Sequence, residues 1–151
     1  MNKEIKKYLM NLDTLKLEDK YVITISICYK TICYLKRIHY LSKELIFSFK
    51  QLHYGEKNIE ENLLEIEGLI AKVEKILEKT FELFESDDWE DEDEKKRINE
   101  ISNLNKEISE LTKTNKEMLK GGLVYTKIFN NLGIISSHAT SIAKALEFRK
   151  D

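Results

Sequence analysis

Proline is absent from this chain of 151 residues, which also contains only five glycines, two cysteines and one tryptophan. Without proline, and with lysine, glutamate and leucine abundant, long helices can form without interruption, so the composition favours an all-α protein. Cys28 and Cys33 fall on different faces of one expected helix and cannot bond each other. We therefore expect two reduced cysteines and, because no secretory signal is recognisable at the N-terminus, a cytoplasmic protein.

Long apolar runs and a dominant charge are also missing. The longest uncharged stretch, residues 128–143, is interrupted by asparagine, serine and histidine, so we expect no membrane span. The net charge is −2, but it divides into +5 for residues 1–54, −11 for residues 55–110 and +4 for residues 111–151. Either the acidic middle lies beside the basic ends within one molecule, or a basic face binds phosphates or an acidic partner.

Apolar residues recur at helical spacing in four long segments, at about 17–54, 58–85, 88–120 and 123–149. The connections between them are short, which predicts antiparallel neighbours. We therefore expect an elongated, antiparallel (up-and-down) four-helix bundle with coiled-coil-like seams, forming a single domain over residues 1–151. A short extra N-terminal helix is expected at residues 2–10.

The first long segment is apolar on most of its circumference. Its expected stripe is Cys28, Ile32, Leu35, Ile38, Leu41, Leu45, Phe49 and Leu52. Such a helix needs cover on several sides, which predicts that it lies at the centre of the bundle. Residues 21–29 are rich in β-branched side chains and alternate as a strand would, but no second strand is recognisable, and helix is the preferred interpretation.

The later segments have narrower apolar seams. In the second, the seam is Ile59, Leu63, Ile66, Ile70, Val73, Leu77, Phe81 and Phe84, extended by Leu69, Ile76 and Leu83. In the third it is Ile98, Ile101, Leu104, Ile108, Leu111 and Met118, with Asn115 as a lone polar residue that would fix register. The fourth seam, Val124, Ile128, Leu132, Ile135, Ala139, Ile142 and Leu146, is flanked by small residues.

Two features suggest contacts with other proteins. Gly133, Ser137, Thr140 and Ser141 belong to the small-residue surface of the last helix, which serves either close packing inside the bundle or self-association. Trp89 stands in the acidic connection between the second and third helices. It either covers the end of the bundle or anchors a partner.

Most of the catalytic patterns expected of helical proteins are absent from the sequence. No histidine follows a glutamate by three residues, as bundle di-iron sites require, and cysteine and histidine lack structural-zinc spacing. A glycine-rich phosphate loop is absent. One acidic pattern remains, formed by Glu60, Glu61, Glu65, Glu85 and Asp88.

This pattern is loosely similar to the Mg²⁺-binding carboxylates of all-α nucleotide pyrophosphohydrolases of the MazG type. The resemblance implies a Mg²⁺ site at Glu61, Glu65, Glu85 and Asp88 that would hold a polyphosphate. Two departures stand against it. The first cluster is spaced by one residue too many, and Glu85 and Asp88 lie at an expected helix end.

Basic residues on the first long helix give another alternative. Lys36, Arg37, Lys43 and Lys50, with tyrosines nearby, could form a face for nucleic-acid phosphates, or they could simply be the solvated side of the helix. The interpretation that we favour is a non-catalytic helical bundle without cofactor, acting through protein–protein interaction or self-association as an adaptor or assembly subunit. A small subunit of a nucleic-acid-binding assembly and a Mg²⁺-dependent pyrophosphohydrolase-like enzyme are the alternatives.

Overall fold

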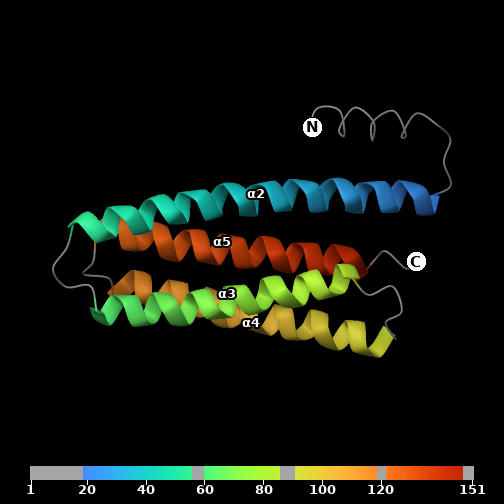
Figure 1. The fold of residues 1–151 in the computed structure, drawn as a ribbon. Helices are drawn as coiled ribbons and strands as arrows, with labels where there is room; N and C mark the ends of the chain where they lie inside the picture. The colour runs from blue at the N-terminus through green and yellow to red at the C-terminus, as the bar shows by residue number, and fades with distance from the viewer. Residues whose placement is uncertain (1–18, 56–59, 86–90, 119–121, 148–151) are drawn as a thin grey trace.

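The computed structural model describes residues 19–55, 60–85, 91–118 and 122–147, and all of them are helical (Figure 1). The helices are α2 (Asp19–Gly55), α3 (Glu60–Glu85), α4 (Asp91–Met118) and α5 (Gly122–Glu147). They form an elongated antiparallel bundle, as predicted. The short helix expected at residues 2–10 lies outside the described residues. Residues 21–29 belong to α2, so helix was the right interpretation of that ambiguous stretch.

The bundle is centred on α5, and α2 lies at its edge. In Figure 1, α5 lies between α2 on one side and α3 and α4 on the other. It packs against all three, whereas α2 packs against α5 alone among the described helices. The prediction that the first long helix is the centre was therefore wrong. Small side chains explain why α5 takes this place, since Ala139, Ala143 and Ser136 have no exposed surface and let three neighbours approach closely.

The α5 seam was predicted almost entirely correctly, because all of its residues from Ile128 to Leu146 are buried and only Val124 is half-exposed. The core of α3 follows steps of three and four: Ile66, Leu69, Val73, Ile76, Thr80 and Leu83. Ile66 and Val73 were predicted as seam residues and Leu69, Ile76 and Leu83 as the extension of the seam, whereas Thr80 was not predicted. By contrast, Ile70, Leu77 and Phe84 are half-buried and Phe81 is 52% exposed. The buried face of α3 thus keeps Ile66 and Val73 of the predicted seam and is otherwise formed mainly by its predicted extension.

Polar residues replace two apolar ones in the buried face of α4. Ile98, Ile101 and Ile108 are buried as expected, but Leu104 is half-buried and Leu111 is 39% exposed. Asn105 and Thr112 lie on the inward face instead, and Ser136 of α5 donates a hydrogen bond to Asn105 Oδ1 at 2.7 Å. Side chains of Asn115 and Met118 are outside the described part. Gly122, with a φ of 74°, begins α5 in the left-handed region that favours glycine.

Candidate interaction surface

Helix α2 turns one narrow face toward α5. This buried or half-buried face follows steps of four and three: Ile27, Thr31, Tyr34, Ile38, Leu41, Leu45, Ser48 and Leu52. Only half of the predicted stripe belongs to it. Cys28 and Leu35 are exposed, because the sequence prediction combined residues from two neighbouring lines of the helix. Ser48 fits in the apolar surroundings because its hydroxyl bonds the Glu44 carbonyl at 2.9 Å.

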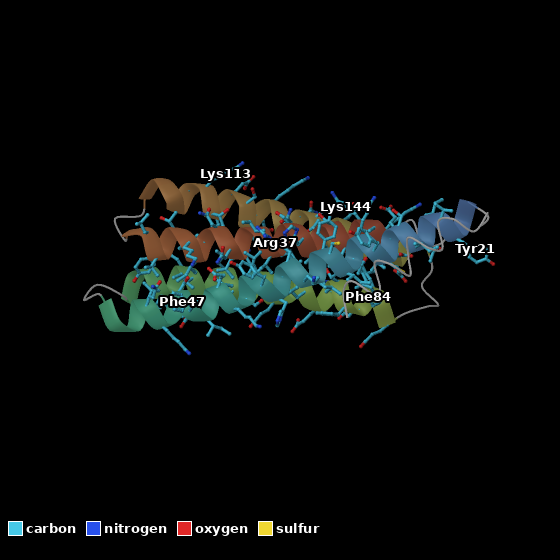
Figure 2. All side chains as sticks on the ribbon, turned by 90° about the horizontal axis from the view of Figure 1, so that it is seen from above. Tyr21, Arg37, Phe47, Phe84, Lys113 and Lys144 are labelled. Atoms are coloured by element: carbon cyan, nitrogen blue, oxygen red, sulfur yellow. The ribbon has the colours of Figure 1, made fainter. Side chains whose placement is uncertain are left out.

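Beside the buried face runs a second line of residues with the same four-and-three spacing. We call it the second seam: Tyr21, Ile25, Cys28, Ile32, Leu35, His39, Ser42, Ile46 and Phe49. It is apolar at most positions, yet Ile46 is 58% exposed, Tyr21 49% and Leu35 37%. Tyr21 projects outward at one end of the molecule (Figure 2). Ile25, Ile32 and Phe49 are half-buried, and the polar residues His39 and Ser42 interrupt the line. Exposed apolar side chains grouped along one helix are typical of a binding site.

Around Cys28 and Ile32, the second seam forms one wall of an apolar groove between α2 and α3. Near the end of the bundle where α3 finishes, a hollow of about 270 Å³ is lined by Thr24, Ile27, Cys28, Thr31, Ile32, Phe84 and Leu146. Leu146 of α5 therefore contributes to the groove together with residues of both outer helices. The buried Thr31 hydroxyl, which borders this hollow, has no hydrogen-bond partner among the described residues. The groove thus presents apolar walls and one unsatisfied polar atom.

The opposite wall is a column of half-buried residues on α3, spaced by seven: Leu63, Ile70, Leu77 and Phe84. Glu67 and Glu74, both exposed, lie next to this column on the outer side. The other flank of α3 is tied to α4, since Lys72 bonds Glu107 at 2.5 Å and Lys79 bonds Glu100 at 2.6 Å. Each lysine donates a hydrogen bond that lowers the pKa of its glutamate. These ion pairs leave the groove-side column facing away from α4.

On the other flank of α2, cationic side chains lie over two exposed aromatic rings. The Arg37 guanidinium lies 5.9 Å from the centre of the Tyr40 ring, and Lys127 of α5 lies 5.9 Å from that of Phe47. Lys127 also pairs with Glu44 at 2.6 Å. These rings therefore have partners within the molecule, of the cation–π kind. On the second seam, on the other side of α2, Leu35 is 37% exposed and Ile46 58% exposed.

The residues proposed for nucleic-acid binding lie on the outer surface of α2. Lys36, Lys43 and Lys50 are spaced by seven, so they form one row along the side opposite to α5. All three are exposed, and no ion pair joins them to another described residue. Arg37 lies outside this row, beside Tyr40 and near His138. The structure thus groups three of the four predicted residues.

His138 of α5 is half-buried between Tyr34 and Arg37 of α2. Its ring lies 5.2 Å from the ring of Tyr34 and is tilted by 34°. Burial lowers the pKa of His138 below its ordinary value, and the nearby Arg37 guanidinium lowers it further. The neutral form of this imidazole is therefore favoured in the folded protein.

The acidic residues suggested as a Mg²⁺ site do not come together in the described part of the chain. Glu65 and Glu85 are exposed on the same helix, and 20 residues of α-helix span about 30 Å. The side chains of Glu61 and Asp88 lie outside the described part. Within the four described helices, no group of three or more histidine, cysteine or acidic side chains could hold one metal ion.

The small residues of α5 divide between the interior and the surface. Thr140 is buried and donates its hydroxyl to the Ser136 carbonyl at 2.9 Å. Gly133 is half-buried beside Thr112 of α4, while Ser137 is exposed and Ser141 half-buried. Thr140 thus lies inside the bundle, whereas Gly133 has room for a Cβ beside Thr112. Trp89 lies outside the described residues.

The second seam is the feature that sequence reasoning missed. Its signal was present in the sequence, because two heptad-spaced lines can be separated when each residue of α2 is assigned to one line only.

Comparison of the chain with protein families, with curated proteins and with solved structures found no match. No described helix is both long and apolar enough to cross a membrane.

Proposed function

We propose that this chain is a non-catalytic helical-bundle protein that acts by binding another protein, or a second copy of itself, along α2. The observation that supports the proposal is the second seam, where Leu35 and Ile46 are exposed on a helix that packs against α5 alone among the described helices. An additional helix laid on this line would complete the pattern by which helices bury apolar faces in bundles. The groove beside it gives such a helix two apolar walls.

The length of the surface suits a stable interaction. A helix of 37 residues is about 55 Å long and α3 about 39 Å, so strips roughly 10 Å wide along both amount to about 900 Å². Specific protein–protein interfaces bury about 800 Å² on each partner. The second seam and the column on α3 together are therefore large enough for a specific complex.

Site-specific photo-crosslinking in the host cell tests the proposal. A photoreactive phenylalanine at Ile46, 58% exposed on the second seam, should give a protein adduct. The same group at Leu123, which is 89% exposed at the start of α5, should give none above background. The mass of the adduct identifies the partner as this chain or another protein. Equal labelling at the two positions, or none at Ile46, would refute the proposal.

The row of lysines supports a second candidate function, which is binding of nucleic-acid phosphates. Three cations at seven-residue intervals lie about 10 Å apart, on one side of a straight helix. Retention of the protein on RNA or DNA should then decrease steeply with salt, and Lys36→Glu with Lys43→Glu should abolish it. Retention that survives both substitutions would exclude this face as the binding site.

A further inference from the structure

The two walls of the groove carry charge of opposite sign. Helix α2 carries six lysine or arginine residues against two acidic ones, whereas α3 carries three lysines against eight glutamates. The lysine row borders the second seam, and Glu67 and Glu74 border the column on α3. No Cα atom of α2 lies within 8 Å of one of α3, and no ion pair joins Lys36 or Lys43 to Glu67 or Glu74, so these opposite charges are not paired within one molecule.

This arrangement is self-complementary. A twofold axis parallel to the helices would lay α2 of each copy over α3 of the other, and both contacts would be equivalent. The basic border of one helix then meets the acidic border of the other twice in each dimer. A twofold axis across the helices would instead lay α2 on α2 and bring two lysine rows together, which is unfavourable.

The structure of one copy also determines the register. Rotation about an axis parallel to the helices does not shift them lengthwise, so residues at the same level in one molecule lie opposite each other in the dimer. Phe84 of α3 is level with the segment from Thr24 to Ile32, because both line one hollow. Since α2 and α3 run antiparallel with equal rise, Glu74 is level with about residue 38 and Glu67 with about residue 45. Lys36 would face Glu74 of the second copy, and Lys43 would face Glu67.

We infer that the occupant of the groove is a second copy of this chain, in a dimer whose twofold axis is parallel to the helices, so that α2 of each copy packs antiparallel on α3 of the other. The apolar core of this interface is the second seam together with Leu63, Ile70, Leu77 and Phe84. The inference rests on the proposed function and names its partner. The rows of Lys36 and Lys43 and of Glu67 and Glu74 select the pairing, since charge complementarity at the border of an interface sets orientation.

Sedimentation equilibrium of the full chain is the first test, with two neighbouring residues as a matched pair. Ile46 on the second seam and Phe47 beside it are 58% and 55% exposed, so neither belongs to the buried core. Ile46→Glu should raise the dimer dissociation constant by on the order of a hundredfold, because each dimer would bury the new charge twice. Phe47→Glu, on the other side of α2, should leave it nearly unchanged. Equal effects of the two substitutions would overturn the inference.

Charge reversal tests the pairing itself. A variant with Lys36→Glu and Lys43→Glu, and another with Glu67→Lys and Glu74→Lys, should each dimerise about tenfold more weakly or worse. Mixed in equal amounts, they should form a heterodimer with an affinity near that of the wild type, because opposite charges then face each other in both contacts. If the Glu67→Lys and Glu74→Lys variant dimerises as well as the wild type, α2 does not lie on α3 and the inference is wrong.

The two native cysteines provide a probe that needs no substitution. Cys28 lies on the second seam and Cys33 on the far flank of α2, and both are exposed in one copy. With rising protein concentration, Cys28 should become protected from maleimide labelling while Cys33 stays reactive. A monomer in which Cys28 is protected at every concentration would show that the chain covers its own groove, and would overturn the inference. A monomer with reactive Cys28 that crosslinks to another protein through Ile46 would also overturn it but leave the proposed function standing.

Discussion

The hydrogen bond between Ser136 of α5 and Asn105 of α4 offers the sharpest test of how the bundle is held in register. Ser136 has no exposed surface, and Asn105 lies between Ile101 and Ile108, both fully buried. The hydroxyl donates to Asn105 Oδ1 at 2.7 Å, a normal length for a strong bond of this type. A polar pair placed in an apolar seam can fix which turn of one helix faces which turn of the other.

A double-mutant cycle with Ser136→Ala and Asn105→Leu measures the bond. Ser136→Ala should lower the free energy of unfolding by about 1 kcal/mol, because the half-exposed amide can turn to water. Asn105→Leu removes the acceptor. It should change the free energy of unfolding little, because the serine hydroxyl can then bond a carbonyl of its own helix, as Thr140 does. The double variant should be about as stable as the wild type, which gives a coupling energy of about 1 kcal/mol.

Urea unfolding followed by circular dichroism at one fixed protein concentration would measure the cycle, since any self-association makes stability concentration-dependent. In thermal unfolding, each 1 kcal/mol corresponds to a shift of about 2–4 °C for a domain of this size. Strictly additive effects of the two substitutions would show that the bond does not stabilise the fold. The reasoning about register would then fail as well.

Three further predictions concern the centre of the bundle and the surface of α5. Ile128→Ala on α5 should cost about 2–5 kcal/mol in urea unfolding, whereas Leu35→Ala on the exposed line of α2 should cost less than about 1 kcal/mol; similar losses would contradict the central position of α5. Gly133→Ala should stabilise by about 0.5–1 kcal/mol, because its new Cβ would meet the Thr112 side chain at an ordinary 3.5 Å; destabilisation would show tighter packing there. Since the pKa of His138 is lowered on folding, the unfolded chain binds more protons just below pH 6.5, so stability should decrease as the pH falls through that range. His138→Gln should weaken this dependence, and an unchanged slope would contradict it.

Helix formation was readable from the sequence because it depends on local properties. The absence of proline and the abundance of good helix formers favour helices at almost every position. Even residues 21–29, whose β-branched side chains suit a strand, are helical in α2, since no partner strand exists for them to pair with in the described structure. The expected positions of the connections also agree with the gaps between the described helices.

The interaction surface was only partly predictable. The exposed lysines Lys36, Lys43 and Lys50 followed directly from their spacing. The second seam did not, because an apolar line with heptad spacing looks the same whether a neighbour covers it or not. The predicted stripe passed from Cys28, Ile32 and Leu35 on the second seam to Leu41 and Leu45 on the buried face. The periodicity of a sequence therefore locates the buried face of a helix only to within about one neighbouring line of residues.

The sequence by itself determined that the chain forms long helices, about where each one ends, and one buried line of α5, whereas Tyr125, Phe129 and Ala143 are buried outside that line. These properties follow from the backbone preferences of each residue and from the 3.6-residue period of a single helix. Only the tertiary structure decided which helix is surrounded and which lies at the edge. That choice depends on how closely helix axes can approach, and the small side chains of α5 allow three neighbours where the bulkier α2 has one.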